Sequence, residues 1–348
     1  MADDWRDALD ATDAELVDGY QSGFPVERRP FARVAEALDT TETDALERVR
    51  RLRERGVFRR FGAVLNPPVI GSSTLAAVSV PESAFESAAE VINGYRQVNH
   101  NYRRAHEWNM WFVVTAGSRE RREEILAAIA ERLGTDVLTL PMRTDYYIDL
   151  EFPVVNADRI AGGASARTAA TATRVEDARE ELTGFEADLL LEIQDGFPLT
   201  ATPYEDIAAA LGTDTDTVLD AVADLRERRC LKRIGCVVNH VVTGFDSNCM
   251  VVWDVPDGER DAVGERVGAL PFVTLCYHRP RRPAQEWPYN LFTMVHGRDA
   301  AAVEEKIDEL AAEHLSVPHE RLYTEETLKQ TGARYEALLG RPAATADD

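Results

Sequence analysis

GFPVERRPFARVAEALDTTETDALERVRRLRERGVFRRFGAVLN, residues 23–66, decides the fold, because the chain contains this stretch twice. The second copy, GFPLTATPYEDIAAALGTDTDTVLDAVADLRERRCLKRIGCVVN, occupies residues 196–239. The Gly-Phe-Pro that opens the first copy recurs at 196–198, and its Leu-Arg-Glu-Arg at 52–55 recurs at 225–228. A repeat of this length indicates a duplicated domain rather than the short period of a solenoid.

Each copy predicts three helices followed by a strand. Phe31, Val34, Ala35 and Leu38 have the spacing of one helix face, and the Thr/Asp runs TTETD and TDTDT supply the N-cap of the next helix. Strand-like VFRRFGAVLN and CLKRIGCVVN then follow, so each copy predicts three helices and a β-ribbon, which make a winged helix-turn-helix. The predicted helices are 11–21, 31–38 and 43–55 in the first copy, and 184–195, 204–211 and 216–229 in the second.

A βαββαβ pattern follows each winged helix and predicts a ferredoxin-like sandwich. We therefore predict an α+β protein made of a duplicated unit of winged helix-turn-helix plus ferredoxin-like domain. In the first half the predicted elements are 73–81, 82–93, 95–104, 108–116, 118–132 and 137–148; in the second they are 248–256, 257–268, 271–280, 289–296, 298–313 and 318–324. The predicted order is winged helix 1–66, ferredoxin-like domain 67–153, Ala/Thr/Gly-rich linker 154–182, winged helix 183–240, ferredoxin-like domain 241–335 and tail 336–348.

The composition of the chain indicates the cellular environment in which it works. The 348 residues carry a net charge of −22, which fits a protein kept hydrated and dispersed in a high-salt, halophilic cytoplasm. The acidic N-terminus MADDWRDALD lacks the apolar core of a signal peptide, and no apolar run is long enough to cross a membrane. The four cysteines show no zinc-ligand spacing and fit free thiols in a reducing compartment. We therefore expect a cytoplasmic protein with no membrane partner and no metal site of its own.

A basic stretch raises the question of DNA binding. Residues 46–60 hold seven Arg against two Glu, whereas the matching 219–233 holds five basic and three acidic residues. The first copy fits phosphate contact, and it equally fits arginines paired with an acidic surface. Because symmetric DNA readers need both copies, and the chain as a whole repels phosphate, we expect DNA not to be a partner.

In domain order the chain resembles the Lrp/AsnC family of regulators, and DALERVRRLRERGVFRRFGAVLNP is the part most similar to that family's recognition helix and wing. The resemblance implies that the second domain mediates dimerisation and binds small molecules. With two such units in one chain, the halves are expected to pair with each other, and further homo-oligomers remain open.

A polar cluster, NHNYRRAHEWNMWF at 99–112, is not explained by this domain arrangement. If 100–106 is a strand, His100, Tyr102, Arg104 and His106 share one face and Arg103 points to the other. Imidazoles, a phenol and a guanidinium on one strand face suit an anionic, aromatic ligand. A polar interface between domains is the alternative interpretation.

The second half repeats part of this cluster. In TLCYHRPRRPAQEWPYNLFTMVHG, at 274–297, a Tyr-x-Arg aligns with that of the first half, and further arginines and aromatic residues follow. Leu275 stands where His100 would recur, and Thr115 stands where the first half would match His296. The halves are therefore not equivalent, and we expect one complete site rather than two. The candidates from this half are Tyr277, Arg279, Arg282, Trp287 and His296.

These two stretches look like the matched motifs of the siroheme decarboxylase family, with WPYNLFTMVHG and HNYRRAHEWN the most specific parts. That family is similar to Lrp/AsnC regulators in fold and usually has two related subunits, which are fused here. The resemblance implies a carboxy-lyase of haem, and so porphyrin, biosynthesis that converts siroheme to 12,18-didecarboxysiroheme. It implies no cofactor, since iron enters as part of the substrate. A transcriptional regulator sensing a small molecule or haem is the alternative.

On this resemblance the candidate residues take separate roles. A histidine near the ring suits proton delivery at neutral pH. His100 is the first candidate for this catalytic role, with His106 and His296 as alternatives, and ligation of the siroheme iron by a histidine stays open. The substrate-binding candidates are Arg104 and Arg279 as carboxylate clamps, Arg103 and Arg282 as secondary cations, Tyr102 and Tyr277 as orienting residues and Trp287 as pocket wall.

Overall fold

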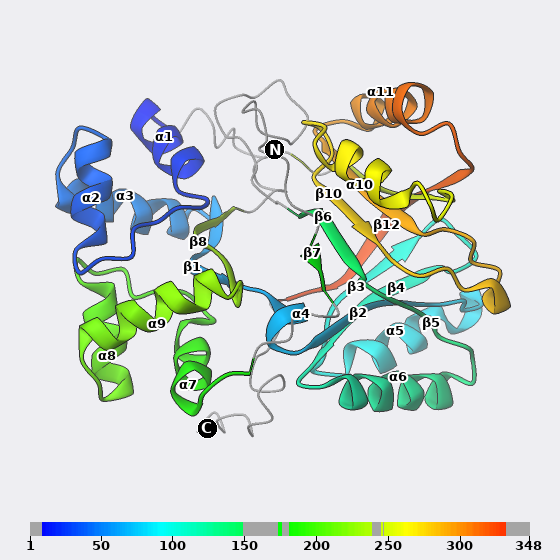
Figure 1. Ribbon diagram of the computed structural model, residues 1–348, viewed down its shortest axis with the longest axis horizontal. Coiled ribbons are helices and arrows are strands. Elements are labelled where there is room, and N and C mark those ends of the chain that lie inside the picture. The colour runs from blue at the N-terminus through cyan, green and yellow to red at the C-terminus, as the bar shows by residue number, and fades with distance from the viewer. Residues whose placement is uncertain (1–8, 149–172, 176–180, 239–244, 246, 332–348) are drawn as a thin grey trace. The chain divides into compact units, whose positions relative to one another are not determined.

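The computed structural model describes residues 9–148, 173–175, 181–238, 245 and 247–331. The predicted linker lies mostly, and the predicted tail wholly, outside these residues. The chain divides into two compact units: one joins the described parts of 1–66 and 180–246, and the other joins those of 67–150, 164–179 and 247–348. The first unit thus contains both helix-turn-helix repeats and the second contains both ferredoxin-like halves (Figure 1).

In its described part the first unit has six helices, three from each repeat. Several begin at a side-chain cap of the kind the Thr/Asp runs predict: Thr41 accepts from the backbone N–H of Asp44 at 3.2 Å, and Thr183 forms a capping box with Glu186. Leu16, Phe31, Leu52 and their counterparts are buried between the helices. The helices are α1 (Ala11–Gly19), α2 (Pro30–Ala37), α3 (Glu42–Glu54), α7 (Gly184–Ile193), α8 (Pro203–Leu211) and α9 (Thr215–Glu227).

The wing of this unit differs from the prediction of one ribbon per copy. Each copy supplies one strand, β1 (Phe58–Leu65) or β8 (Leu231–Val238), and the two pair antiparallel with each other. Gly62 lies opposite Gly235 at the centre of the pair. A Cβ on Gly235 would lie 2.1 Å from the carbonyl oxygen of Tyr20, so this close approach requires glycine. The two repeats are therefore tied together by a shared ribbon.

The second unit is built on one curled, ten-stranded antiparallel sheet. Its order is β5-β2-β4-β3-β12-β9-β11-β10-β6-β7, so the sheet of the first half continues into that of the second. The strands are β2 (Ser72–Val78), β3 (Val98–Arg104), β4 (Met110–Ala116), β5 (Leu138–Pro141), β6 (Thr144–Ile148), β7 (Thr173–Arg174), β9 (Ser247–Trp253), β10 (Leu275–His278), β11 (Leu291–Gly297) and β12 (His319–Gln330).

The halves exchange their last strands. In the first half β5 pairs with β2, and β6 crosses to pair with β10 of the second half. In the second half, residues 319–323 of β12 pair with β9, and residues 324–330 pair with β3 of the first half. The sequence pattern instead predicts one strand at 137–148 and a strand ending at 324. The difference arises because alternating residues indicate a strand but do not identify the strand that pairs with it.

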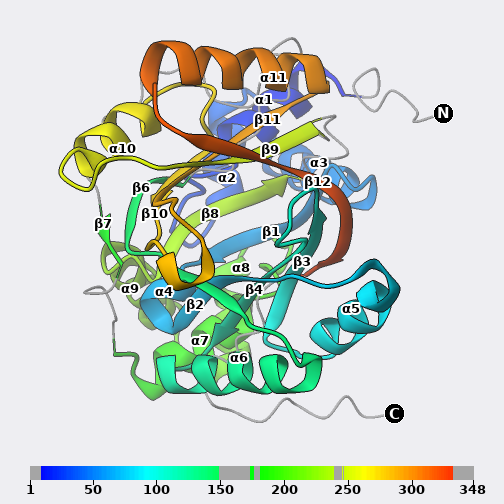
Figure 2. The same cartoon turned by 90° about the vertical axis from the view of Figure 1, so that its right-hand side faces the viewer.

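Helices cover the outer faces of this sheet, α5 and α6 over the first half and α10 and α11 over the second (Figure 2). The inner faces of the two halves meet in an apolar core, which we call the inner cluster. It consists of Leu75, Ala77, Trp108, Trp111, Leu138, Leu140, Met250, Val252, Tyr277, Trp287, Phe292 and Leu322. The helices are α4 (Pro67–Ile70), α5 (Phe85–Asn93), α6 (Arg119–Leu133), α10 (Arg260–Gly268) and α11 (Ala300–Glu309), with short turns at Glu82–Ala84, Pro283–Gln285 and Leu310–His314.

Candidate functional site

Strand β3 presents two chemically different faces, as the alternation predicts. Asn101, on the outer face, is fully buried and donates to Asn93 of α5 at 3.1 Å. His100, Tyr102 and Arg104 lie on the inner face. The His100 and Tyr102 rings are 6.0 Å apart, both are partly exposed, and Arg104 is buried. The inner face of β3 therefore carries a proton carrier, a phenol and a cation in line.

Arg103 belongs to the outer face. Its guanidinium lies 4.4 Å from the centre of the Phe85 ring and pairs with Glu82 at 2.6 Å and Glu325 at 3.3 Å. Two carboxylates thus already pair with the Arg103 guanidinium, and it points away from the inner cluster. This placement argues against the secondary role in substrate binding that the sequence suggested.

Arg104 and Arg279 occupy matching places in the two halves. Arg104 donates to the carbonyl of Leu322, on the exchanged strand β12, and Arg279 donates to the carbonyl of Leu140 on β5. Each guanidinium also lies over a tyrosine of its own strand, 5.7 Å from the Tyr102 ring and 4.6 Å from the Tyr277 ring.

Neither of these buried cations faces a carboxylate among the described residues. They are 6% and 8% exposed, and in both the Nε atom lacks a hydrogen-bond partner in the described part of the chain. Burial lowers the pKa of Arg104 and of Arg279, since desolvation opposes the charged form. An anion would stabilise two guanidiniums that are held out of water with no carboxylate partner in the described ranges.

Tyr277 and Trp287 lie deeper than the sequence suggested. The Tyr277 ring stacks on Phe292 with centroids 5.7 Å apart, and its hydroxyl contacts the sulfur of Met250 at 3.8 Å. Trp287 is 1% exposed and packs 5.4 Å from Trp111. Both belong to the inner cluster, so they form its apolar floor. The half-exposed Tyr102 is the more accessible of the two aligned tyrosines.

His106 does not lie on the strand as predicted. Strand β3 ends at Arg104, and His106 follows in a turn. Its Nδ1 accepts from the backbone N–H of Trp108 at 2.9 Å, so Nε2 carries the proton and donates to Glu320 at 2.6 Å. Both ring nitrogens are engaged, which favours a structural role over proton delivery.

His296 is buried at the end of β11 and is oriented by a neighbour that the sequence pattern missed. Nδ1 lies 2.8 Å from the hydroxyl of Thr274, and that hydroxyl donates to the carbonyl of Met294 at 3.1 Å. The hydroxyl oxygen therefore accepts from Nδ1–H, which fixes the orientation of the ring. In the first half, Thr115 takes the equivalent place and contacts Ser73 at 3.2 Å. The halves differ at this position, as predicted.

Arg282 reaches across to the first half, where its Nε donates to the carbonyl of Thr139 at 2.9 Å. It lines a cavity of about 440 Å³ that also contains Arg119, Arg122 and Arg143. Sequence reasoning missed Arg143, since it lies in the break between β5 and β6 where a single strand was predicted. Because these basic residues are widely separated in sequence, no local sequence pattern predicts the cluster that they form.

The cysteines offer no reactive thiolate. Among the described residues all four are buried and free. Burial raises the pKa of Cys249 to about 11 and that of Cys236 to about 12, so both stay protonated. Glu309, Glu313 and His314 come together at the end of α11, but this partly exposed group is remote in sequence from every candidate residue above.

No helix in the described ranges is both long and apolar enough to cross a lipid bilayer.

Comparison with known proteins identifies the family. A model described as the siroheme decarboxylase NirDL-like HTH domain matches residues 13–59 and 186–231, and one described as the AsnC-like ligand binding domain matches 70–146 and 242–329. The siroheme decarboxylase NirDL subunit of Paracoccus pantotrophus is 35% identical over 328 residues, covering 93% of this chain and 97% of the relative.

The chain belongs to the siroheme decarboxylase family. The NirD subunit of Pseudomonas aeruginosa is 45% identical over 146 residues, which cover 42% of this chain and 97% of that subunit, as expected if two such units are fused here. A crystal structure of the siroheme decarboxylase NirDL has the same fold, with a TM-score of 0.71 at 24% identity over 94% of this chain and 96% of that one. A crystal structure of the siroheme decarboxylase NirDL in co-complex with an iron-uroporphyrin III analogue also matches, with a TM-score of 0.69 at 24% identity.

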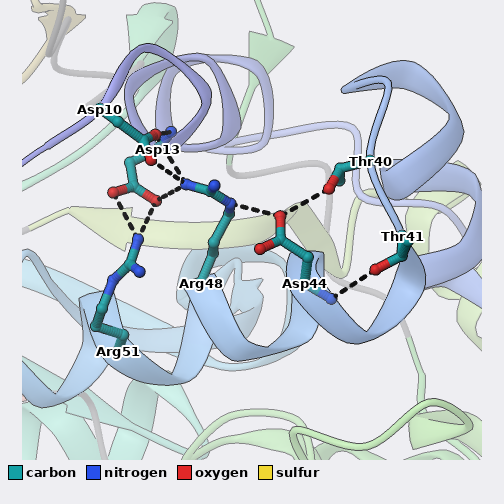
Figure 3. A network of polar contacts seen from close by, with 7 residues as sticks. All are labelled: Asp10, Asp13, Thr40, Thr41, Asp44, Arg48 and Arg51. Carbon is teal, nitrogen blue, oxygen red and sulfur yellow. Dashed lines mark hydrogen bonds and ion pairs between the residues drawn. The ribbon is translucent and has the colours of Figure 1, made fainter.

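Within this siroheme decarboxylase family member, the basic helix α3 is bound by the chain's own carboxylates (Figure 3). Arg48 pairs with Asp10, Asp13 and Asp44 at 2.6–2.7 Å, and Arg51 pairs with Asp13 at 2.6 Å. Asp13 is 1% exposed, so this network is partly shielded from salt. Arg50 donates to the carbonyl of Leu199 in the other repeat. Much of the charge that suggested DNA binding is therefore neutralised or engaged within this unit.

Proposed function

We propose that this protein is a siroheme decarboxylase, a carboxy-lyase that converts siroheme to 12,18-didecarboxysiroheme in haem biosynthesis. The observation that carries the proposal is the match to NirDL subunits along nearly the whole chain, including both halves. The inner face of the second unit supports it. Two buried guanidiniums without carboxylate partners among the described residues suit a substrate rich in carboxylates.

Each decarboxylation breaks the bond between an acetate methylene and its carboxylate carbon. CO₂ leaves, the electron pair remains on the methylene and is delocalised into the tetrapyrrole, and one proton is added to give a methyl group. No oxidant or reductant is consumed. We propose that no separate cofactor takes part, because the macrocycle accepts the electrons and its iron enters with the substrate.

We propose that His100 supplies the proton, with His296 as the alternative donor. His100 is partly exposed on the inner face beside Tyr102, which is where a ring-sized substrate has access. His296 is buried but well oriented, since the Thr274 hydroxyl bonds to its Nδ1. His106 is the weakest of the three, because both of its nitrogens are already bonded.

Arg104 and Arg279 are proposed to bind carboxylates that do not react, and so to orient the one that does. Tyr102 is proposed to orient a carboxylate or stack on the macrocycle, with Tyr277 and Trp287 forming the wall below. Arg282 is proposed as a further cation at the margin of the site. Arg103 is retained only as a salt bridge of the outer face.

We also propose that the protein works in a cytoplasm of high salt and does not bind DNA. The net charge of −22 and the free, buried cysteines support the setting. The ion pairs of Arg48 and Arg51 support the absence of DNA binding, because phosphate would have to displace Asp10, Asp13 and Asp44.

The test is anaerobic incubation of the purified chain with siroheme, followed by mass spectrometry of the tetrapyrrole. We expect the loss of two CO₂ per molecule. Intact siroheme, together with tight and sequence-specific binding to a DNA fragment in a gel-shift assay, would instead support the regulator.

A further inference from the structure

The cavity lined by Arg282 is positively charged in a strongly acidic protein. Four arginines line its volume of about 440 Å³, and Glu123 is the one acidic residue among the described residues that line it. The chain as a whole has 61 acidic against 39 basic residues, so this local composition is the reverse of the average. The volume is within the range of small-molecule sites.

The four arginines come from three separate places in the second unit. Arg119 and Arg122 are in the first turn of α6, Arg143 follows β5, and Arg282 precedes the turn at Pro283–Gln285. The start of β2 closes the cavity with Ser72 and Ser73. Of the candidate residues described above, Arg282 alone lines it.

Glu123 pairs with two of these arginines. Arg119 pairs with Glu123 at 2.8 Å, and Arg122, which is 7% exposed, reaches the same carboxylate at 3.6 Å. Arg122 also donates to the hydroxyl of Ser72 at 2.7 Å, but its Nε has no partner in the described residues. Arg282 donates to backbone carbonyls.

The arginines also repel one another. Burial lowers the pKa of Arg143, and the charges of Arg282 and Arg119 lower it further. Burial likewise lowers the pKa of Arg122 and Arg282. An anion in the cavity would offset both the repulsion and the lost hydration, and guanidinium groups bind carboxylate and phosphate through paired hydrogen bonds.

We propose that this cavity is a binding site for a small oligoanion, a molecule with at least two carboxylate or phosphate groups, held by Arg122, Arg143 and Arg282. Such groups have two sources: a free metabolite, or the acetate and propionate side chains of a tetrapyrrole. The proposal does not depend on decarboxylase activity, because it concerns anion binding alone.

Isothermal titration calorimetry of the full chain at low ionic strength tests it, with citrate and pyrophosphate as probes. We expect one of them to bind, and the double variant Arg143→Gln/Arg282→Gln to weaken that binding by at least ~10-fold, since each lost charged hydrogen bond contributes on that scale. Arg121→Gln is the matched control. Arg121 lies beside Arg122 on α6, pairs with Glu124 at 2.8 Å and does not line the cavity, so its loss should leave affinity unchanged.

A second titration in the presence of a uroporphyrin distinguishes the sources. Displacement of the probe assigns the cavity to tetrapyrrole side chains, and undisturbed binding assigns it to a free metabolite. The proposal is overturned if neither probe binds, or if the double variant, folded by circular dichroism, binds as tightly as the parent.

Discussion

Replacement of Arg279 by methionine separates a ligand-binding role from a structural one. In the ligand-free protein the change removes a charged hydrogen bond to the Leu140 carbonyl, a loss of about 1.5–3 kcal/mol. It also removes the contact with the Tyr277 ring at 4.6 Å, which contributes about 0.5–2 kcal/mol. Against these losses stands the desolvation of a buried guanidinium that faces no carboxylate among the described residues, which costs several kcal/mol. Because methionine fills similar space, we expect the free energy of unfolding to change by less than about 1 kcal/mol.

Siroheme binding should respond differently. Loss of a charged hydrogen bond to a substrate carboxylate weakens binding by about 1.5–3 kcal/mol, which is about 10- to 150-fold in Kd. Arg279→Lys should recover part of this loss, since an ammonium group cannot make the paired contact. Urea denaturation measures the first quantity, and anaerobic absorbance titration with siroheme measures the second.

Arg281→Met is the matched control for this experiment. Arg281 lies two positions further along the chain, and its guanidinium pairs with Asp254 at 2.7 Å and with the carbonyl of Val255. Its replacement should leave siroheme affinity unchanged. If Arg279→Met instead lowers stability by more than about 3 kcal/mol while affinity is intact, Arg279 is a structural clamp between the two halves and the reasoning above is wrong.

Three further predictions concern the proton donor, a glycine of the shared ribbon and the dependence of stability on pH. His100→Gln should bind siroheme normally but decarboxylate it at least ~100-fold more slowly in stopped anaerobic assays; normal turnover in His100→Gln with none in His296→Gln would place the donor in the second half. Gly235→Ala should destabilise the protein by about 2–4 kcal/mol in urea, because its Cβ would lie 2.1 Å from a carbonyl oxygen, whereas Gly258→Ala, with open space around it, should change stability by less than about 1 kcal/mol. Burial lowers the pKa of His278 from 6.5 to about 4, so the ring favours the folded state above pH 6.5 and that stability is lost as the pH falls towards 4. Between pH 7 and 4.5 the parent should therefore lose about 1–2 kcal/mol more than His278→Asn, a figure reduced for the partial exposure of the ring; equal losses would show that His278 is not the group responsible.

Much of the fold could be predicted because local patterns report local structure. The helix at 43–55 corresponds to α3 at Glu42–Glu54, since a Thr cap and a continuous apolar face define both its start and its register. The strand at 108–116 likewise contains β4. The shared ribbon β1–β8 and the crossing of β6 and β12 could not be predicted, because alternation is the same whichever strand lies alongside.

The placement of the candidate residues was predictable along β3, where side chains alternate between the two faces of the sheet, but not beyond the end of that strand. His100, Tyr102 and Arg104 share a face because three alternating residues of β3 must do so. His106 left that series when β3 ended at Arg104, and the Nδ1 contact with Trp108 then fixed its ring. The depth of Tyr277 depends on how the two halves pack, and the Thr274 contact of His296 depends on how β10 pairs with β11; sequence periodicity contains neither.

Strand exchange explains which repeated residues stayed alike and which diverged. Arg104 and Arg279 each bond to a carbonyl contributed by the other half, so the fold holds the two guanidiniums at equivalent, buried positions. His100 and its counterpart Leu275 lie at the margin of the inner cluster, where Leu275 is only partly buried. Packing there does not fix the residue type, so one half can hold an imidazole and the other an apolar side chain at little cost to the fold. An asymmetric proton donor therefore fits a fold whose closely packed positions remain symmetric.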